Sequence, residues 1–273
     1  MPQVLDSHRH IGLLPEFPFY GGAPVRADRT ARATVAELIA DLDTHGIERA
    51  LVLPNYGVPV PEVAFGLNHL ALEAAQHDDR VRCGLWVSPL ASDAERNAEA
   101  LALAAEEGVV ALKTSFLLGG SPTDADCAAQ LDLLFGTAAA LDLVVHVHTS
   151  PGAASDIDQV GTLVERYGDD TKIHLVHLGG GMSGHMKLIG GRFFDWIERG
   201  KRVYTDTSWT IGFAPTWLVA EIEARGIGDD RVLFATDSPW GDFEGEHARL
   251  RSAAGDGELA EAFFHRNFEA LYG

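Results

Sequence analysis

Short apolar runs rich in β-branched residues alternate with longer amphipathic segments along the whole chain. The apolar runs predict eight strands, at residues 3–8, 50–54, 81–88, 109–115, 143–148, 172–177, 202–206 and 231–237. The segments between and after them predict helices at 34–45, 61–77, 93–107, 124–141, 157–167, 193–199, 215–225 and 258–271. Continuous apolar strands that alternate with helices are typical of a parallel sheet covered by helices.

Eight strand–helix units in 273 residues favour a closed (β/α)8 TIM barrel over an open doubly wound sheet, which usually has fewer strands. No G-x-G-x-x-G or G-x-x-x-x-G-K-[ST] phosphate loop follows a predicted strand, which argues against nucleotide-binding versions of the open sheet. No linker, repeat or low-complexity segment divides the chain. The sequence therefore predicts an α/β protein with one TIM-barrel domain over residues 1–273.

Composition and charge narrow the choice of partners. The chain has 46% apolar residues, and its 21 Lys and Arg against 40 Asp and Glu give a formal net charge of −19. This charge disfavours nucleic acids and anionic membranes, which need an excess of basic groups. Only Cys83 and Cys127 are present, and neither a signal peptide nor an apolar stretch of about 18 residues is found. The expected location is the cytoplasm.

Metal-binding residue types gather at the predicted carboxyl ends of the strands, where catalysis takes place in parallel barrels. Because side chains alternate along a strand, each H-x-H pair is expected to point to one side. Neutral imidazole and carboxylate are natural ligands of Zn²⁺. A single H-x-H can be a structural pair, and a single strand-end Asp can be a helix N-cap. Their coincidence at several strand ends favours a metal site, with candidates His8, His10, His146, His148, His177, Asp206 and Asp237.

Six segments resemble the amidohydrolase superfamily, specifically the amidohydrolase-related group that includes aminocarboxymuconate-semialdehyde decarboxylase. D-S-H-R-H-I-G at 6–12 resembles the D-x-H-x-H opening of that group, and V-H-L-G-G-G at 176–181 resembles its H-x-G-G segment. The other four are L-V-V-H-V-H-T at 143–149, V-Y-T-D-T-S at 203–208, V-L-F-A-T-D-S-P-W at 232–240 and N-F-E-A-L-Y-G at 267–273. The likeness covers nearly the full chain, and the combination is specific to the group.

The resemblance implies one divalent metal, Zn²⁺ before Mn²⁺, held by His8, His10, His148 and Asp237. His148 is preferred to His146 because it lies nearer the end of its strand, which leaves His146 one layer deeper in a structural role. Lys113 resembles the lysine that is carboxylated and bridges two metals in some relatives. The group often carries an unmodified lysine there, so one metal is the expectation.

The implied activity is hydrolysis of a small organic substrate by a metal-activated water. Asp237 would act as the acid/base, and His177 would polarise the substrate. The first alternative is non-oxidative decarboxylation of a small unsaturated or aromatic carboxylic acid, with the same Asp protonating carbon as CO₂ departs. The second is a catalytically inactive barrel that binds a ligand. Fold and ligands do not separate these chemistries.

Aromatic and basic residues near the strand ends predict a pocket for a small, flat, partly apolar molecule. The same aromatics could instead pack loops against the barrel rim, and exposed arginines are common. The resemblance is also compatible with a homodimer. The candidate substrate-binding residues are Arg9, Phe17, Tyr20, Lys113, Trp209 and Trp240.

Overall fold

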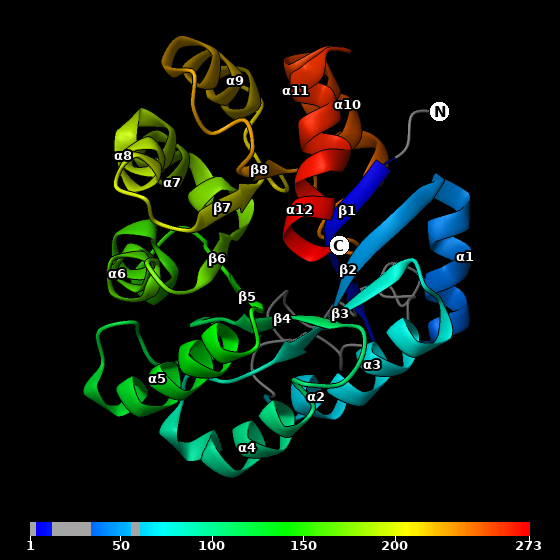
Figure 1. Ribbon diagram of the computed structural model, residues 1–273, viewed down its shortest axis with the longest axis vertical. Helices are drawn as coiled ribbons and strands as arrows, with labels where there is room; N and C mark the ends of the chain where they lie inside the picture. The colour runs from blue at the N-terminus through cyan, green and yellow to red at the C-terminus, as the bar shows by residue number, and fades with distance from the viewer. Residues whose placement is uncertain (1–3, 13–33, 56–60) are drawn as a thin grey trace, which may run out of the picture.

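The computed structural model describes residues 4–12, 34–55 and 61–273. Eight strands pair in parallel, in chain order, and curve into a barrel surrounded by helices (Figure 1). The predicted (β/α)8 fold is therefore confirmed. The strands are β1 (Val4–Ile11), β2 (Ile47–Pro54), β3 (Val81–Trp86), β4 (Val109–Thr114), β5 (Val144–Val147), β6 (Lys172–Leu175), β7 (Val203–Asp206) and β8 (Val232–Leu233).

The helices follow the predicted pattern with four differences. The segments 61–77 and 258–271 each form two helices instead of one, and two helices, α7 and α10, were not predicted. The helices are α1 (Val35–His45), α2 (Pro61–Gly66), α3 (Asn68–His77), α4 (Ala94–Ala102), α5 (Ala125–Ala140), α6 (Ile157–Tyr167), α7 (Gly181–Lys187), α8 (Phe193–Glu198), α9 (Ala214–Arg225), α10 (Phe243–Ala254), α11 (Glu258–Glu261) and α12 (Asn267–Tyr272).

Helix α1 shows how local sequence sets these boundaries. Thr34 is its N-cap and forms a capping box, in which its hydroxyl accepts a hydrogen bond from the backbone N–H of Glu37 and the Glu37 carboxylate accepts one from Thr34. Gly46 ends the helix with φ of 63°, a conformation that glycine adopts without a steric penalty. The next residue begins β2, so the helix returns the chain to the barrel within one residue.

The barrel closes where β1 meets the segment that follows β8. Among the described residues, the β pairing between them is one isolated parallel bridge, between Arg9 and Ser238. Backbone hydrogen bonds support it on either side: the Asp237 N–H donates to the His8 carbonyl, and the His10 N–H donates to the Ser238 carbonyl, both at 2.8 Å. The first and last parts of the barrel are thus held together at the level of the predicted metal ligands.

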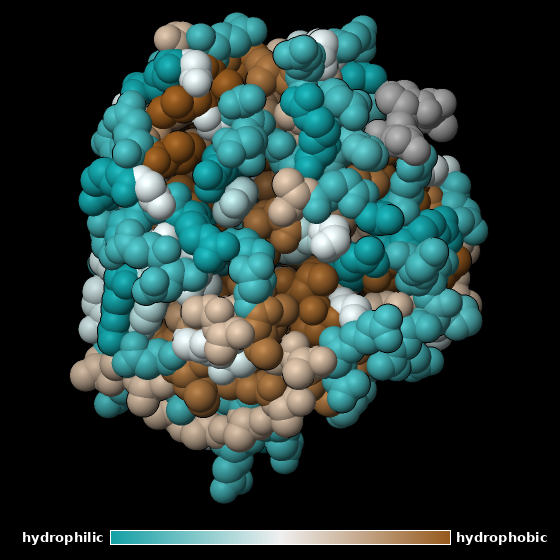
Figure 2. Space-filling model, viewed as in Figure 1, coloured by the Kyte–Doolittle hydropathy of each residue, from teal (hydrophilic) through white to brown (hydrophobic). Residues whose placement is uncertain are grey.

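Two apolar layers form the core. The larger one packs the outer faces of the strands against the surrounding helices. The smaller one lies inside the barrel, where Phe268, Leu271 and Tyr272 of α12 pack on inward-facing residues such as Leu5 and Leu233. Helix α12 therefore lies over one end of the barrel, near the centre of Figure 1. In Figure 2 hydrophilic residues dominate the left and right edges of this face, and hydrophobic residues are seen in its middle, at the upper left and along the lower edge.

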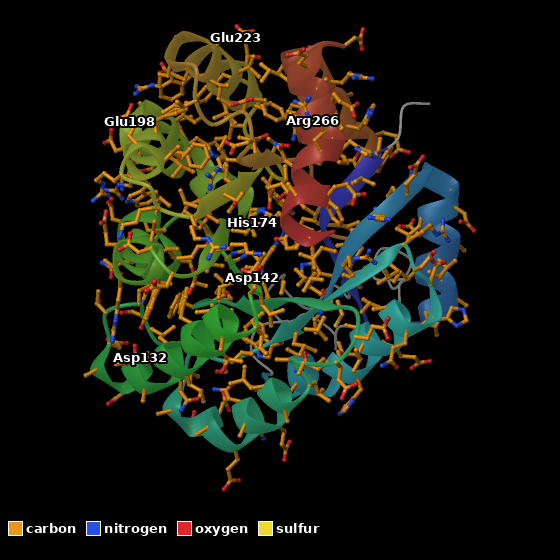
Figure 3. The ribbon with its side chains drawn as sticks, in the orientation of Figure 1. Asp132, Asp142, His174, Glu198, Glu223 and Arg266 are labelled. Atoms are coloured by element: carbon orange, nitrogen blue, oxygen red, sulfur yellow. The ribbon has the colours of Figure 1, made fainter. Side chains whose placement is uncertain are left out.

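Both cysteines, Cys83 and Cys127, are buried as free thiols. Among the described residues, no helix combines the length and the apolar character needed to cross a membrane. Acidic side chains such as Asp132 and Glu198 lie on the outer helices, whereas His174 lies near the middle of the barrel (Figure 3). The polar interior is therefore built from residues of the strands and strand ends.

Candidate active site

The chain bends sharply at two of the predicted site residues. Strands were expected over 172–177 and 231–237, but β6 ends at Leu175 and β8 at Leu233. Beyond them His177 has φ of 59° and Asp237 has φ of 56°. A left-handed backbone is uncommon for non-glycine residues and persists where other contacts hold it. Here the His177 N–H donates to the Asp206 carboxylate, and the Asp237 N–H donates to the carbonyl of His8.

Three ligand atoms meet at the closing point of the barrel. His8 Nε2 lies 3.0 Å from His10 Nε2 and 3.1 Å from Asp237 Oδ1, and His10 Nε2 lies 3.0 Å from Asp237 Oδ1. Tetrahedral zinc with bonds of about 2.0 to 2.2 Å separates its ligand atoms by about 3.3 to 3.6 Å. The triangle is therefore close to one face of such a coordination shell, as the alternation of His8 and His10 along β1 predicts.

Hydrogen bonding shows why this triangle suits a cation. His10 Nδ1 lies 3.0 Å from the carbonyl oxygen of Pro54, which can only accept, so Nδ1 carries the proton. Nε2 is therefore the nitrogen of His10 that is available to a cation, and it lies beside the Asp237 carboxyl group. Burial, together with the charge of Lys113, lowers the pKa of His8 well below its ordinary value, so the His8 ring is neutral. Converging lone pairs of this kind fit a divalent metal.

A fourth ligand could come from either of two histidines. One possible metal-binding group consists of His177, His8 and Asp237, whose ligand atoms all lie within 4.8 Å of one another. His177 Nε2 lies 4.0 Å from Asp237 Oδ2. His148 follows β5, and its ring centroid lies 5.1 Å from that of His177 in an edge-on arrangement. Both face the same cavity, so the assignment of His148 as a ligand stays a prediction.

A cavity of about 460 Å³ opens above the triangle. His10, His148, His177 and Asp237 form part of its wall, and the remaining lining residues are Leu117, Thr149, Ser150, Pro151, Gly180, Gly181, Trp209 and Trp240. The loop glycines are needed here: a Cβ on Gly180, whose φ is 74°, would lie 2.5 Å from the Cα of Ser150. The two predicted tryptophans therefore do line a pocket with the metal-binding candidates.

Trp209 forms the outer part of this wall. Its side chain is 53% exposed, and its ring centroid lies 6.5 Å from that of His177. The backbone of Trp209 has φ of 55°, and its N–H donates to the Glu246 carboxylate of α10 at 3.2 Å. Burial raises the pKa of Glu246 to about 7. Trp240 is fixed differently, because its indole N–H donates to the side chain of Asn55 at 3.0 Å.

A second polar layer lies deeper, toward the middle of the barrel. Lys113 and His146 are neighbours in the register of β4 and β5, and Lys113 Nζ lies 3.0 Å from His146 Nδ1. Both residues are fully buried, and burial lowers the pKa of Lys113 to about 7. Neither lines the cavity. His146 thus lies one layer below His148, as predicted, and Lys113 does not reach the cavity as a substrate ligand would.

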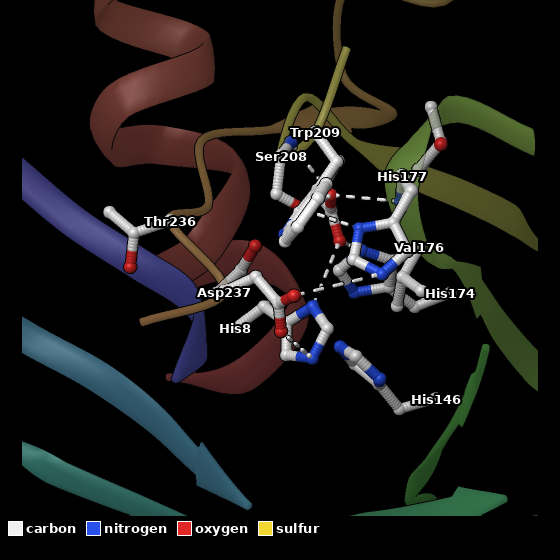
Figure 4. Close-up of polar contacts among 12 residues, drawn as sticks. His8, His146, His174, Val176, His177, Ser208, Trp209, Thr236 and Asp237 are labelled. Atoms are coloured by element: carbon white, nitrogen blue, oxygen red, sulfur yellow. Dashed lines mark hydrogen bonds and ion pairs between the residues drawn. The ribbon is translucent and has the colours of Figure 1, made fainter. Parts of the chain in front are cut away.

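Asp206, at the end of β7, connects the two layers. Its Oδ2 accepts a hydrogen bond from His174 Nε2 at 3.0 Å and lies 3.8 Å from His8 Nδ1. Its Oδ1 accepts from the backbone N–H groups of His177 and Ser208 and from the Ser208 hydroxyl (Figure 4). Burial opposes ionisation, but the hydrogen bond from His174 and its neighbours lowers the pKa of Asp206 overall. The sequence marked Asp206 as a strand-end carboxylate but gave it no role.

The remaining predicted substrate ligands have different fates. Arg9 is buried, its guanidinium contacts Asp6 at 3.0 Å and also pairs with Asp41, and it does not line the cavity. The structure therefore corrects the expectation that Arg9 binds substrate, because these carboxylates already hold its charge. Phe17 and Tyr20 lie outside the described residues.

The parallel barrel carries a triangle of candidate metal ligands at the carboxyl ends of β1 and β8, the end at which TIM-barrel enzymes have their active sites. The amidohydrolase family model matches residues 6–273, and the chain therefore belongs to the amidohydrolase family. No curated relative matches the sequence.

Solved structures with the same fold cover almost the whole chain. The 2,6-dihydroxybenzoate decarboxylase from Rhizobium has a TM-score of 0.71 and 18% identity, covering 100% of this chain and 99% of the other. A dihydroxybenzoic acid decarboxylase from a Polaromonas species, with bound manganese and 2-nitroresorcinol, has a TM-score of 0.70 and 17% identity, covering 100% and 97%. A probable 2-pyrone-4,6-dicarboxylic acid hydrolase from Acinetobacter baumannii, with bound citric acid, has a TM-score of 0.64 and 14% identity, covering 99% of each chain.

Proposed function

We propose that this amidohydrolase is a metal-dependent, non-oxidative decarboxylase of a small aromatic or unsaturated carboxylic acid. The observation that carries the proposal is the position of Asp237. Its Oδ1 belongs to the ligand triangle, while its Oδ2 lies 4.0 Å from His177 Nε2 at the floor of a cavity walled by Trp209 and Trp240. One carboxylate is thus shared between a metal-binding and a proton-transfer position.

The residues divide the reaction between them. His8, His10 and Asp237 would hold one Mn²⁺ or Zn²⁺ ion, with His148 as a further ligand. When bound, the metal supplies positive charge next to the carboxylate of the substrate and offsets the charge that develops as its C–C bond breaks. The tryptophans hold a flat ring by its faces.

Proton transfer completes the reaction. Asp237 first takes up a proton from a hydroxyl group of the substrate or from solvent and then delivers it to the carbon atom from which CO₂ leaves, so that a carboxylate and a proton become CO₂ and a new C–H bond. His177 lies beside Asp237 and holds a polar group of the substrate. The fold similarity to two decarboxylases supports this reading over hydrolysis, which was the first expectation from the sequence. Hydrolysis by the same residues is the second candidate, because a probable hydrolase shares the fold.

A paired substrate panel tests the proposal. The protein, prepared without metal and reloaded with Mn²⁺ or Zn²⁺, is incubated with hydroxybenzoic acids such as 2,6-dihydroxybenzoate and separately with 2-pyrone-4,6-dicarboxylate in H₂¹⁸O. Release of CO₂ from an aromatic acid, lost in Asp237→Asn, is the expected result. Incorporation of ¹⁸O into an opened lactone without CO₂ release would replace the proposal with the hydrolase.

A further inference from the structure

We infer that Asp206 and Ser208 are positioning residues that fix the tautomer of His177, so that its Nε2 presents a lone pair to the cavity. This inference concerns the site of the proposed function and adds a role for two residues outside the ligand set. The relevant contacts lie on one side of the His177 ring, away from Asp237 (Figure 4).

As a first step, the contacts of the Ser208 hydroxyl group determine where its proton points. Ser208 Oγ lies 2.5 Å from Asp206 Oδ1, a separation at which one of the two oxygen atoms must donate. Asp206 also accepts hydrogen bonds from His174 Nε2 and from the backbone N–H groups of His177 and Ser208. A carboxyl group surrounded by donors in this way is an ionised acceptor. The hydroxyl proton of Ser208 therefore points to Asp206.

The second step concerns the His177 ring. His177 Nδ1 lies 2.8 Å from the same Ser208 Oγ. Because the only proton of that hydroxyl is already directed to Asp206, the oxygen can only accept from the ring. Nδ1 must then carry a proton, whatever the charge of the ring. In the neutral ring the lone pair is consequently on Nε2, which faces Asp237 Oδ2 and the cavity.

Donors and acceptors can also be assigned for the hydrogen bonds of Asp206 that lie away from the cavity. The His174 Nε2–H is used on Asp206, so His174 Nδ1 is an acceptor for the hydroxyl of Tyr272 at 2.6 Å. On this side too each proton points toward Asp206, because Tyr272 donates to His174 and His174 donates to Asp206. Asp206 thus receives protons from both sides and has none to return to Ser208. This one-way order keeps the Ser208 hydroxyl from reversing.

The consequence is a specific role for His177. A neutral His177 cannot donate a hydrogen bond to an oxyanion in the cavity, as the expected polarising role would need. Its Nε2 instead acts as an acceptor for a hydroxyl group of the substrate or of a water molecule, or as the further metal ligand described above. An orienting group behind a histidine that works at the opposite nitrogen is a recurrent arrangement in catalysis and in metal sites.

The test reads the tautomer directly, without substrate. Long-range ¹H–¹⁵N spectra of the ¹⁵N-histidine-labelled protein, metal-free and loaded with diamagnetic Zn²⁺, are assigned for His177 with a His177→Gln variant. The wild type is expected to show a protonated, pyrrole-type Nδ1 and a pyridine-type Nε2 in the metal-free form. A wild-type ring with its proton on Nε2 overturns the inference whether or not the decarboxylase activity is found.

Matched serine variants sharpen the result. Ser208→Ala is expected to move His177 toward the Nε2–H tautomer and to lower kcat about 10-fold, with little change in KM. Ser208→Thr keeps the hydroxyl and should keep the wild-type tautomer. Ser155→Ala removes another buried hydroxyl, outside this network, and should change neither the spectrum nor kcat. A lower kcat in Ser208→Ala with the wild-type tautomer would show a merely structural role and reject the inference.

Discussion

The two polar layers of the barrel are built from the same residue types but differ in how their hydrogen bonds close. In the deep layer Lys113 pairs with His146, and His174 is held between Tyr272 and Asp206, although His146 Nε2 makes no hydrogen bond with the described residues. In the upper layer, the nitrogen of His10 and the oxygen of Asp237 meet as acceptors. A histidine cluster therefore does not by itself mark a metal site. The marker is a set of lone pairs that only a cation can satisfy.

The largest effect is expected for Asp237→Asn, which tests the upper layer. The amide keeps the size of the side chain but removes the negative charge from the ligand triangle and the proton from the cavity. Activity should fall at least about 10³-fold, with the fold intact by circular dichroism. Turnover on the panel and metal content are measured together. Retained wild-type activity would contradict the proposed role of Asp237.

Replacing one histidine of each layer by alanine should give the next largest effect. His10→Ala should remove most of the bound metal, measured by elemental analysis of protein reloaded from the chelated form. His146→Ala should retain the metal but lower the free energy of unfolding by about 2 kcal/mol, because the buried hydrogen bond between His146 and Lys113 is lost. Urea titrations measure this loss. If His146→Ala loses the metal while His148→Ala keeps it, the ligand on the β5 side is His146.

The pH dependence of stability tests the deep layer more finely. Burial lowers the pKa of Lys113 from 10.5 to about 7 in the folded protein. Between these values the unfolded chain binds one more proton, so the free energy of unfolding should rise with pH. The rise should be smaller in Lys113→Met by up to about 1.4 kcal/mol per pH unit. Equal slopes in urea titrations of the two metal-free proteins would show that Lys113 stays charged when folded.

The smallest effect is expected at the mouth of the cavity. Trp209→Ala should raise KM for an aromatic acid roughly 2- to 10-fold, because face-to-face or edge contacts of aromatic rings contribute about 0.5 to 1.5 kcal/mol. The free energy of unfolding should change little, since the side chain is 53% exposed. Steady-state kinetics measure KM, and Trp217→Ala serves as the control for loss of a tryptophan that does not line the cavity. An unchanged KM would place the substrate away from this wall.

The barrel and its ligand triangle were within reach of sequence analysis because both depend on local periodicity. Eight apolar runs predicted eight strands, and alternation along β1 placed His8 and His10 on one side. Helix α10 was missed because it has few large apolar residues, and α7 because its glycines suggested turns. These helices depend on tertiary packing more than on propensity.

The errors at single residues have a different cause, since they depend on contacts distant in sequence. Arg9 was assigned to the substrate because nothing in the local pattern shows that Asp41, 32 residues away, would hold its charge. The roles of Asp206 and Ser208 follow from the left-handed turn at His177, which no periodicity predicts. The sequence identified the residue types at the strand ends, whereas the directions of the hydrogen bonds were needed to assign the role of each residue.

The ligand triangle also has a topological meaning. Its histidines come from β1 and its aspartate from the segment after β8, so His10 and Asp237 are 227 positions apart. A bound ion would cross-link the two ends of the sheet, where a single bridge joins them as a ladder. Ligands that bind only the folded state stabilise it by mass action. Metal removal should therefore accelerate hydrogen exchange first where β1 meets the segment after β8. The ion would then stabilise the closure of the barrel in addition to its role in the reaction.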